Sequence, residues 1–110
     1  MTSGSERRLY ARKPLRTRGF LAEKGSTALE VQTIDLSVGG MCIVTPNQLM
    51  VGNEYIISVD LLSNGKNRRV AATIEVAYSL GNSKDGFKSG LRFVDIDDAS
   101  AAVVEEWMKE

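Results

Sequence analysis

Residues Tyr55 to Tyr78, YIISVDLLSNGKNRRVAATIEVAY, carry the clearest strand pattern of the chain. On both sides of the central Asn64-Gly65 pair, apolar residues recur at every second position, which is the period of a strand with one buried face. The recurring residues are Tyr55, Ile57, Val59, Leu61, Val70, Ala72, Ile74, Val76 and Tyr78. Asn-Gly suits the positive φ angles of a type I′ turn. The stretch therefore predicts an antiparallel hairpin with these side chains toward a core.

The segment before this hairpin continues the strand pattern with one irregularity. Between residues 29 and 38 the inward apolar positions change from odd to even numbers near Thr33. The predicted inward residues are Leu29, Val31, Ile34, Leu36 and Val38. Because side chains alternate strictly along a regular strand, this change predicts a bulge or sharp bend near Thr33.

Three further ranges are predicted to be strands, and the chain ends in a helix. Residues 16–23 carry a weak strand pattern, 41–44 an uninterrupted apolar one, and 87–94 the last one, after a polar loop at 81–86. Near the C-terminus the period changes, because Val103 with Trp107 and Val104 with Met108 are spaced for one helix face. Asp97 and Asp98 precede them and suit a helix N-terminus.

Five or six short antiparallel strands and one helix predict a mainly β fold. A small closed antiparallel β-barrel with one C-terminal α-helix is favoured over a sandwich, because closure removes exposed strand edges. We expect a disordered N-terminus at 1–6 and one domain over 7–110. Within that domain we expect an arginine-rich arm at 7–14, the barrel at 15–95 and the helix at 97–109.

Composition narrows the classes of function. The chain has 110 residues, 43% of them hydrophobic, and a single cysteine, Cys42, which suits one compact domain without a disulfide and favours the cytoplasm. No apolar run is long enough for a membrane span, and Met1 to Glu6 lacks the apolar stretch of a signal peptide. The chain has no histidine, the commonest general base and zinc ligand, so an enzyme is the least expected class. We expect no metal and no cofactor.

Charge is unevenly distributed although the formal net charge is zero. Residues 1–24 hold seven Lys or Arg and two acids, whereas residues 95–110 hold six acids and one Lys. Arg7, Arg8 and Arg12 lie close together, and guanidinium groups bind phosphates and the Hoogsteen edge of guanine bidentately. The cluster is either an anion-binding arm or a solvated basic segment. Zero net charge and 6% aromatic residues argue against a nucleic-acid binder.

A second group of polar residues lies at Asp35-Leu36-Ser37-Val38-Gly39-Gly40, where one predicted strand meets the next. Strand geometry places Asp35 and Ser37 on one face. Their carboxylate and hydroxyl could bind a guanine or a phosphate, and Gly40 would allow a positive φ or a close ligand approach. The alternative is a tight turn in which Asp35 and Ser37 satisfy local backbone groups.

Together, Arg8-x-x-x-Arg12 and Asp35-x-Ser37-x-x-Gly40 resemble the PilZ domain family, whose paired RxxxR and (D/N)xSxxG motifs bind cyclic di-GMP. The resemblance covers nearly the whole chain. It implies a six-stranded antiparallel barrel with a C-terminal helix and a role in bacterial second-messenger signalling. Arg8 and Arg12 would then clamp phosphates and guanine edges, and Asp35, Ser37 and Gly40 would line the barrel side.

The resemblance also implies one ligand or an intercalated pair. Arg7, just before the first motif, is either a further stacking or phosphate contact or a solvent-exposed cation. We expect a non-enzymatic cyclic di-GMP receptor that signals by ordering its arm and then contacting a partner protein. The alternative is a PilZ-like protein-interaction module with weak or no nucleotide binding. Neither a membrane nor a nucleic acid is an expected partner.

Four other features are weaker candidates for chemistry. We expect Tyr78 to finish a core face, although it could stack on a guanine. Trp107 is predicted to anchor the helix in the core, and Cys42 to be inert packing. The acidic Asp95-x-Asp97-Asp98 sequence fits a helix N-terminus better than a cation loop.

Overall fold

The computed structural model describes residues 11–23, 25–82 and 86–110, so the N-terminus expected to be disordered, 1–6, lies outside the described residues. Seven strands and one helix span most of this part of the chain. They are β1 (Lys13–Pro14), β2 (Arg18–Ala22), β3 (Leu29–Ser37), β4 (Gly40–Thr45), β5 (Glu54–Ser63), β6 (Lys66–Asn82), β7 (Gly86–Ile96) and α2 (Asp98–Met108).

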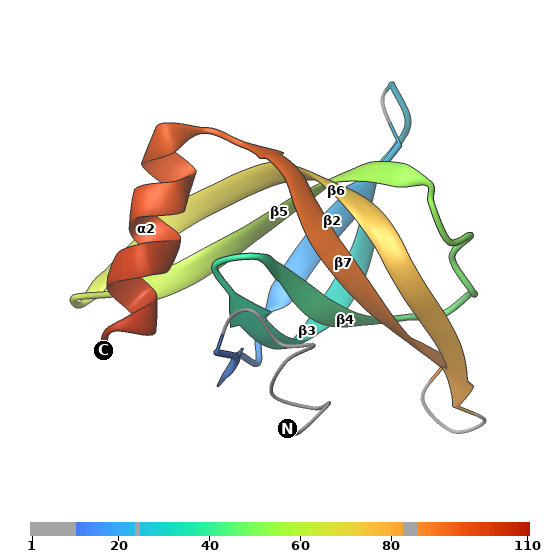
Figure 1. The fold of residues 1–110 in the computed structure, drawn as a ribbon, viewed down its shortest axis with the longest axis horizontal. Coiled ribbons are helices and arrows are strands. Elements are labelled where there is room, and N and C mark those ends of the chain that lie inside the picture. Colours follow the sequence, from blue (N-terminus) through green and yellow to red (C-terminus); the bar gives the residue numbers. More distant parts are fainter. Residues whose placement is uncertain (1–10, 24, 83–85) are drawn as a thin grey trace, which may run out of the picture.

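Six of these strands close into an antiparallel barrel (Figure 1). The hydrogen-bonded order is β1-β3-β2-β5-β6-β7-β4, and an additional pairing of β3 with β4 closes the ring. The two-residue β1 lies outside the ring and pairs with the end of β3, next to β2 on the same side of that strand. The predicted mainly β barrel with one C-terminal helix is confirmed.

The β5–β6 hairpin forms as its sequence predicts. Asn64 and Gly65 have φ angles of 52° and 78°, and Ser63 pairs with Lys66, which is the geometry of a two-residue primed turn. The alternating apolar residues up to Val76 point inward. The core consists of Leu21, Val31, Leu36, Met41, Ile43, Ile57, Val59, Leu61, Val70, Ala72, Ile74, Val76, Leu91, Val103, Val104 and Trp107.

The predicted irregularity in β3 is a bulge. The pairing with β4 shifts between Thr33 and Asp35, so Ile34 is the extra residue and Thr33 and Leu36 both point inward. The expectation that Ile34 points inward is wrong, because it is half-buried and does not belong to the core. The expectation that Leu29 and Val38 point inward is wrong, since their exposed fractions are 42% and 40%. Both lie at the ends of the segment, where the strand leaves the closed part of the barrel or enters the turn.

A second bulge lies in β6, and because of it the expectation that Tyr78 finishes a core face is wrong. The pairing with β7 shifts between Val76 and Tyr78, so Ala77 is an extra residue and every later side chain changes face. Tyr78 is half-buried on the outer face, and Ser79 takes the inward position with an exposed fraction of 5%. The apolar period in the sequence continues through Tyr78 and gives no sign of this bulge.

Helix α2 packs across β5 and β6 at one end of the barrel (Figure 1). Asp97 is its N-cap, and its carboxylate accepts a hydrogen bond of 2.6 Å from the backbone N–H of Ser100. Val103, Val104 and Trp107 are buried in the core, which confirms Trp107 as the predicted anchor. The acidic sequence before the helix is therefore a helix start, as predicted.

The predicted loop at 81–86 is shorter than expected, because Gly81 and Asn82 belong to β6 and Gly86 to β7, while 83–85 lie outside the described residues. Among the described residues, no helix is long and apolar enough to cross a membrane. That same part of the chain contains no group of three or more Cys, Asp or Glu residues arranged to hold a metal ion.

Candidate functional site

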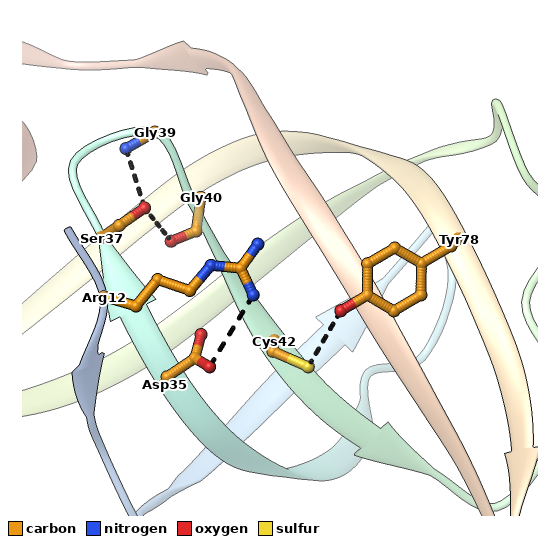
Figure 2. Close-up of polar contacts among 7 residues, drawn as sticks. All are labelled: Arg12, Asp35, Ser37, Gly39, Gly40, Cys42 and Tyr78. Atoms are coloured by element: carbon orange, nitrogen blue, oxygen red, sulfur yellow. Dashed lines mark hydrogen bonds and ion pairs between the residues drawn. The ribbon is translucent and has the colours of Figure 1, made fainter. Parts of the chain in front are cut away.

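The two motifs meet on the outer face of the barrel (Figure 2). Arg12 directly precedes β1, and the pairing of Pro14 with Asp35 brings this segment beside β3. Arg12 Nη1 lies 3.9 Å from Asp35 Oδ2, and the two side chains are 39% and 19% exposed. A guanidinium and a carboxylate from distant parts of the chain thus share one partly exposed position, where a ligand could bind both.

Ser37 lies one alternation beyond Asp35, at the turn into β4. Its Oγ accepts a hydrogen bond of 3.2 Å from the backbone N–H of Gly39 and donates one of 3.3 Å to the carbonyl of Gly40 (Figure 2). The predicted shared face with Asp35 is present, but this hydroxyl also stabilises the turn. A hydroxyl has two acceptor lone pairs, so one of them is left for another donor.

Gly40 serves the barrel rather than a turn with a positive φ. It is absent from the positive-φ glycines of the described residues, which are Gly25, Gly52, Gly65 and Gly86. A Cβ at Gly40 would collide with the backbone carbonyl oxygen of Leu91 in β7. Close packing of two strands therefore requires glycine at this position, and the expected positive φ is wrong.

Next to the ion pair, four residues form one row across the outer face. The pairings join Asp35 to Cys42, Cys42 to Gly90 and Gly90 to Tyr78. Because Gly90 has no side chain, the Tyr78 ring lies over it and reaches across β7, with its hydroxyl 3.6 Å from Cys42 Sγ (Figure 2). The row places a phenol, a thiol and the Arg12–Asp35 pair side by side.

Burial and neighbouring charges change the titration of two groups in this row. The pKa of the Cys42 thiol is raised, first because burial disfavours the thiolate and also because Asp35 is negative; the hydrogen bond with Tyr78 and the cations Lys88 and Arg12 oppose the rise. Burial likewise raises the pKa of Tyr78, whereas Arg12 lowers it. Cys42 is therefore a protonated, buried thiol near neutral pH, consistent with its predicted packing role.

An open depression of about 760 Å³ adjoins the Arg12–Asp35 pair. Its lining comes from the residue before β1, from β1, β3, β4 and β7, and from the link between β1 and β2. The lining residues are Arg12, Pro14, Arg16, Gln32, Thr33, Ile34, Asp35, Val44 and Lys88. Three of them carry a positive charge and one a negative charge, so the depression suits an anionic ligand.

Not all of the predicted site residues can be placed. Arg7 and Arg8 lie outside the described residues. Arg12, Asp35, Ser37 and Gly40 lie within one part of the barrel surface, as described above. Arg16 and Arg18 belong to neither motif, yet Arg16 lines the depression. Arg18 in β2 pairs with Gln32 in β3, and its Nη1 lies 3.9 Å from Glu30 Oε1.

Sequence reasoning missed Lys88, Gln32 and the outward position of Tyr78. Lys88 and Gln32 are polar residues in alternating strands, and their proximity depends on the β3–β4–β7 register. One usable signal was Gly90, since glycine inside a strand often marks a close approach by another group. Here that group is the ring of Tyr78.

Solved structures with the same fold are known. MotI/DgrA, the inhibitor of motility of Bacillus subtilis, superposes with a TM-score of 0.79 at 14% identity over 93% of this chain and 50% of that chain. PlzA of Borreliella burgdorferi, solved in complex with c-di-GMP, gives a TM-score of 0.64 at 14% identity over 94% of this chain and 42% of that chain. The chain thus spans half or less of the length of each, and the likeness is one of fold.

A comparison with curated protein sequences gave no match. In a comparison with sequence models of protein families, residues 6–110 match the PilZ domain, which is nearly the whole chain. The barrel, its C-terminal helix and the meeting of the two motifs agree with that match. This chain therefore belongs to the PilZ domain family.

Proposed function

We propose that this chain is a non-enzymatic receptor domain for cyclic di-GMP that acts in the bacterial cytoplasm. The observation that carries the proposal is the meeting of Arg12 and Asp35, one from each motif, at 3.9 Å beside an anion-suited depression. The guanidinium can bind a phosphate or the O6 and N7 of guanine, and the carboxylate can accept from guanine N1–H and N2–H₂. Membership of the PilZ family and the PlzA complex support the choice of ligand.

The proposed mechanism is that ligand binding orders the arm that carries Arg8 and Arg12. From Lys13 onward the chain already pairs with β3, so the ordering concerns the residues before it. Between Met1 and Arg12 few residues are apolar, whereas fixing each residue costs about 1–2 kcal/mol of backbone entropy. A ligand that bridges both arginines to Asp35 would offset that cost and create a surface for a partner protein.

Calorimetric titration with cyclic di-GMP tests the receptor function. We expect saturable binding and a clear preference over GTP, GMP and cyclic AMP, because each motif can hold part of a ligand with two guanines and two phosphates. Arg12→Ala should weaken binding about tenfold to a hundredfold, through loss of a charge-assisted contact. Arg69→Ala is the matched control, since its guanidinium is paired with Asp60 near the β5–β6 hairpin, away from the site.

Absence of heat at about 100 μM ligand would contradict the proposal. A dissociation constant of that size corresponds to a binding free energy of roughly 5–6 kcal/mol. Equal losses in Arg12→Ala and Arg69→Ala would point to diffuse electrostatics instead of a motif site.

A second candidate function is a protein-interaction module with weak or no nucleotide binding. It is favoured by the structural roles of two motif residues, because the Ser37 hydroxyl stabilises the β3–β4 turn and Gly40 packs on Leu91. These residues would be required in the fold even without a ligand. The same titration distinguishes the two functions.

A further inference from the structure

The depression beside the motif site extends to a second row of residues. Gln32, Val44 and Lys88 are paired across β3, β4 and β7, and all three line the depression. They lie two residues along β4 and β7 from the Cys42–Gly90 row, which is a step of about 7 Å along a strand. The Gln32–Val44–Lys88 row lies farther from the Ser37–Gly40 turn than the Cys42–Gly90 row does.

Arg16 is fixed at the rim of this depression although it belongs to no strand. The backbone N–H of Leu15 donates to the carbonyl of Ile34 at 3.0 Å, and that of Thr17 donates to Thr33 Oγ1 at 2.9 Å. The buried Thr33 hydroxyl in turn donates to the carbonyl of Leu15 at 2.7 Å. Both neighbours of Arg16 are thus bonded to the β3 bulge, so the position of its backbone is set.

Not every cation at the depression has a carboxylate partner among the described residues. Ion pairs among the described residues join Arg12 to Asp35, Arg18 to Glu30, Arg68 to Glu106, Arg69 to Asp60 and Arg92 to Glu75. Arg16 and Lys88 are in none of these pairs. Two exposed cations therefore face one depression that contains a single carboxylate, that of Asp35.

We propose that Arg16, Gln32 and Lys88 form a second ligand-contacting row, which binds the half of the cyclic dinucleotide that the motif residues leave uncovered. The inference rests on the proposed function. The two cations would bind a phosphate, the Gln32 amide would donate to and accept from a base edge, and the Val44 side chain would offer an apolar floor. This row makes binding depend on the whole dinucleotide and discriminates against a single nucleotide.

Substitution outside both motifs tests the second row. In calorimetric titrations with cyclic di-GMP, Lys88→Gln and Arg16→Gln should each raise the dissociation constant about threefold to tenfold while the thermal midpoint stays unchanged. Their affinity for GMP should change less than their affinity for cyclic di-GMP. Arg69→Gln and Lys66→Gln, which remove the same charge at the β5–β6 hairpin away from the depression, are the matched controls and should bind like the wild type.

Three outcomes would overturn the second row. If the wild type binds cyclic di-GMP and Arg12→Ala weakens it, but both Lys88→Gln and Arg16→Gln bind normally, the second row is wrong and the receptor function stands. If the two controls lose as much affinity as the two test variants, the effect is long-range charge and not contact. If the wild type fails to bind, the receptor function and the second row fall together.

Discussion

Gly40 shows how one motif residue can be required by the barrel itself. In Gly40→Ala the added Cβ would collide with the Leu91 carbonyl oxygen, a backbone atom that cannot rotate away, so the free energy of unfolding should fall by about 1–3 kcal/mol. Urea unfolding measures this loss. Val38→Ala in the same turn, where the side chain is 40% exposed, should change stability little. Wild-type stability of Gly40→Ala together with lost ligand binding would instead assign the glycine to the ligand.

Cys42 supplies a prediction about pH. Because its pKa is raised by folding, the folded state binds this proton more tightly than the unfolded state, and the resulting stability is fully present below the pKa of the unfolded thiol. That stability is lost as the pH rises through the pKa of the folded thiol. Between pH 7 and about pH 9.5, the free energy of unfolding should therefore fall more for the wild type than for Cys42→Ala.

The measurement is urea unfolding at several pH values. Tyr78, whose pKa is also raised, remains in Cys42→Ala and leaves part of the decline in place. Identical declines in the two proteins would show that the thiol does not contribute to it.

For single residues, the sequence predicts the correct face of a strand where inward and outward side chains alternate without a break. It predicts the wrong face where a bulge interrupts this alternation. Asp35 and Ser37 share the outer face because they are two apart in β3, beyond its bulge. Tyr78 was assigned to the wrong face because Ala77 adds one residue to β6, and this depends on the pairing with β7. The role of Gly40 depends on the carbonyl of Leu91, a neighbour that only the closed barrel provides.

At the scale of elements, β1 and the end of α2 are joined by Lys13. Its Nζ lies 4.3 Å from the centre of the Trp107 ring and donates to the carbonyls of Trp107 and Glu110 at 2.7 and 3.0 Å. The last turn of α2 has no basic residue of its own, so this lysine supplies the cation that stabilises the helix C-terminus. Arg12 and Lys13 are adjacent, so the site and the helix are connected through one short segment.

Lys13→Met keeps the aliphatic stem on Trp107 and removes only the ammonium group. We expect a loss of about 1–2 kcal/mol in stability, from the cation–π contact and the carbonyl hydrogen bonds, and faster hydrogen exchange in the last turn of α2. Lys66→Met, on the exposed β5–β6 hairpin, is the control. Equal stability and equal exchange in the two variants would mean that Lys13 does not hold the helix.

The Lys13–Trp107 contact also marks the limit of sequence reasoning about elements. The helix, its Asp97 cap and the Asn64-Gly65 hairpin are encoded within a few residues each and were predicted. The contact of Lys13 joins residues 94 positions apart, and β1 is too short to have a period. Such features follow from closure of the barrel and cannot be derived from a local pattern.

At the scale of the whole molecule, the site exists because the barrel closes. The β3–β4 pairing that completes the ring also places Asp35 beside Cys42, and β4–β7 then brings Lys88 and Gly90 into line. In the proposed mechanism this closed surface stays fixed, and only the arginine-rich arm becomes ordered. The response to ligand should therefore be confined to one part of the chain.

Backbone amide relaxation, measured with and without saturating cyclic di-GMP, tests this claim most directly. Order parameters from Arg8 to Arg12 should rise on ligand addition toward the rigid value of about 0.85, while those of the barrel from Leu29 to Val94 should stay nearly constant. Unchanged order parameters from Arg8 to Arg12 in a protein that calorimetry shows to be saturated would contradict ordering of the arm as the signalling step.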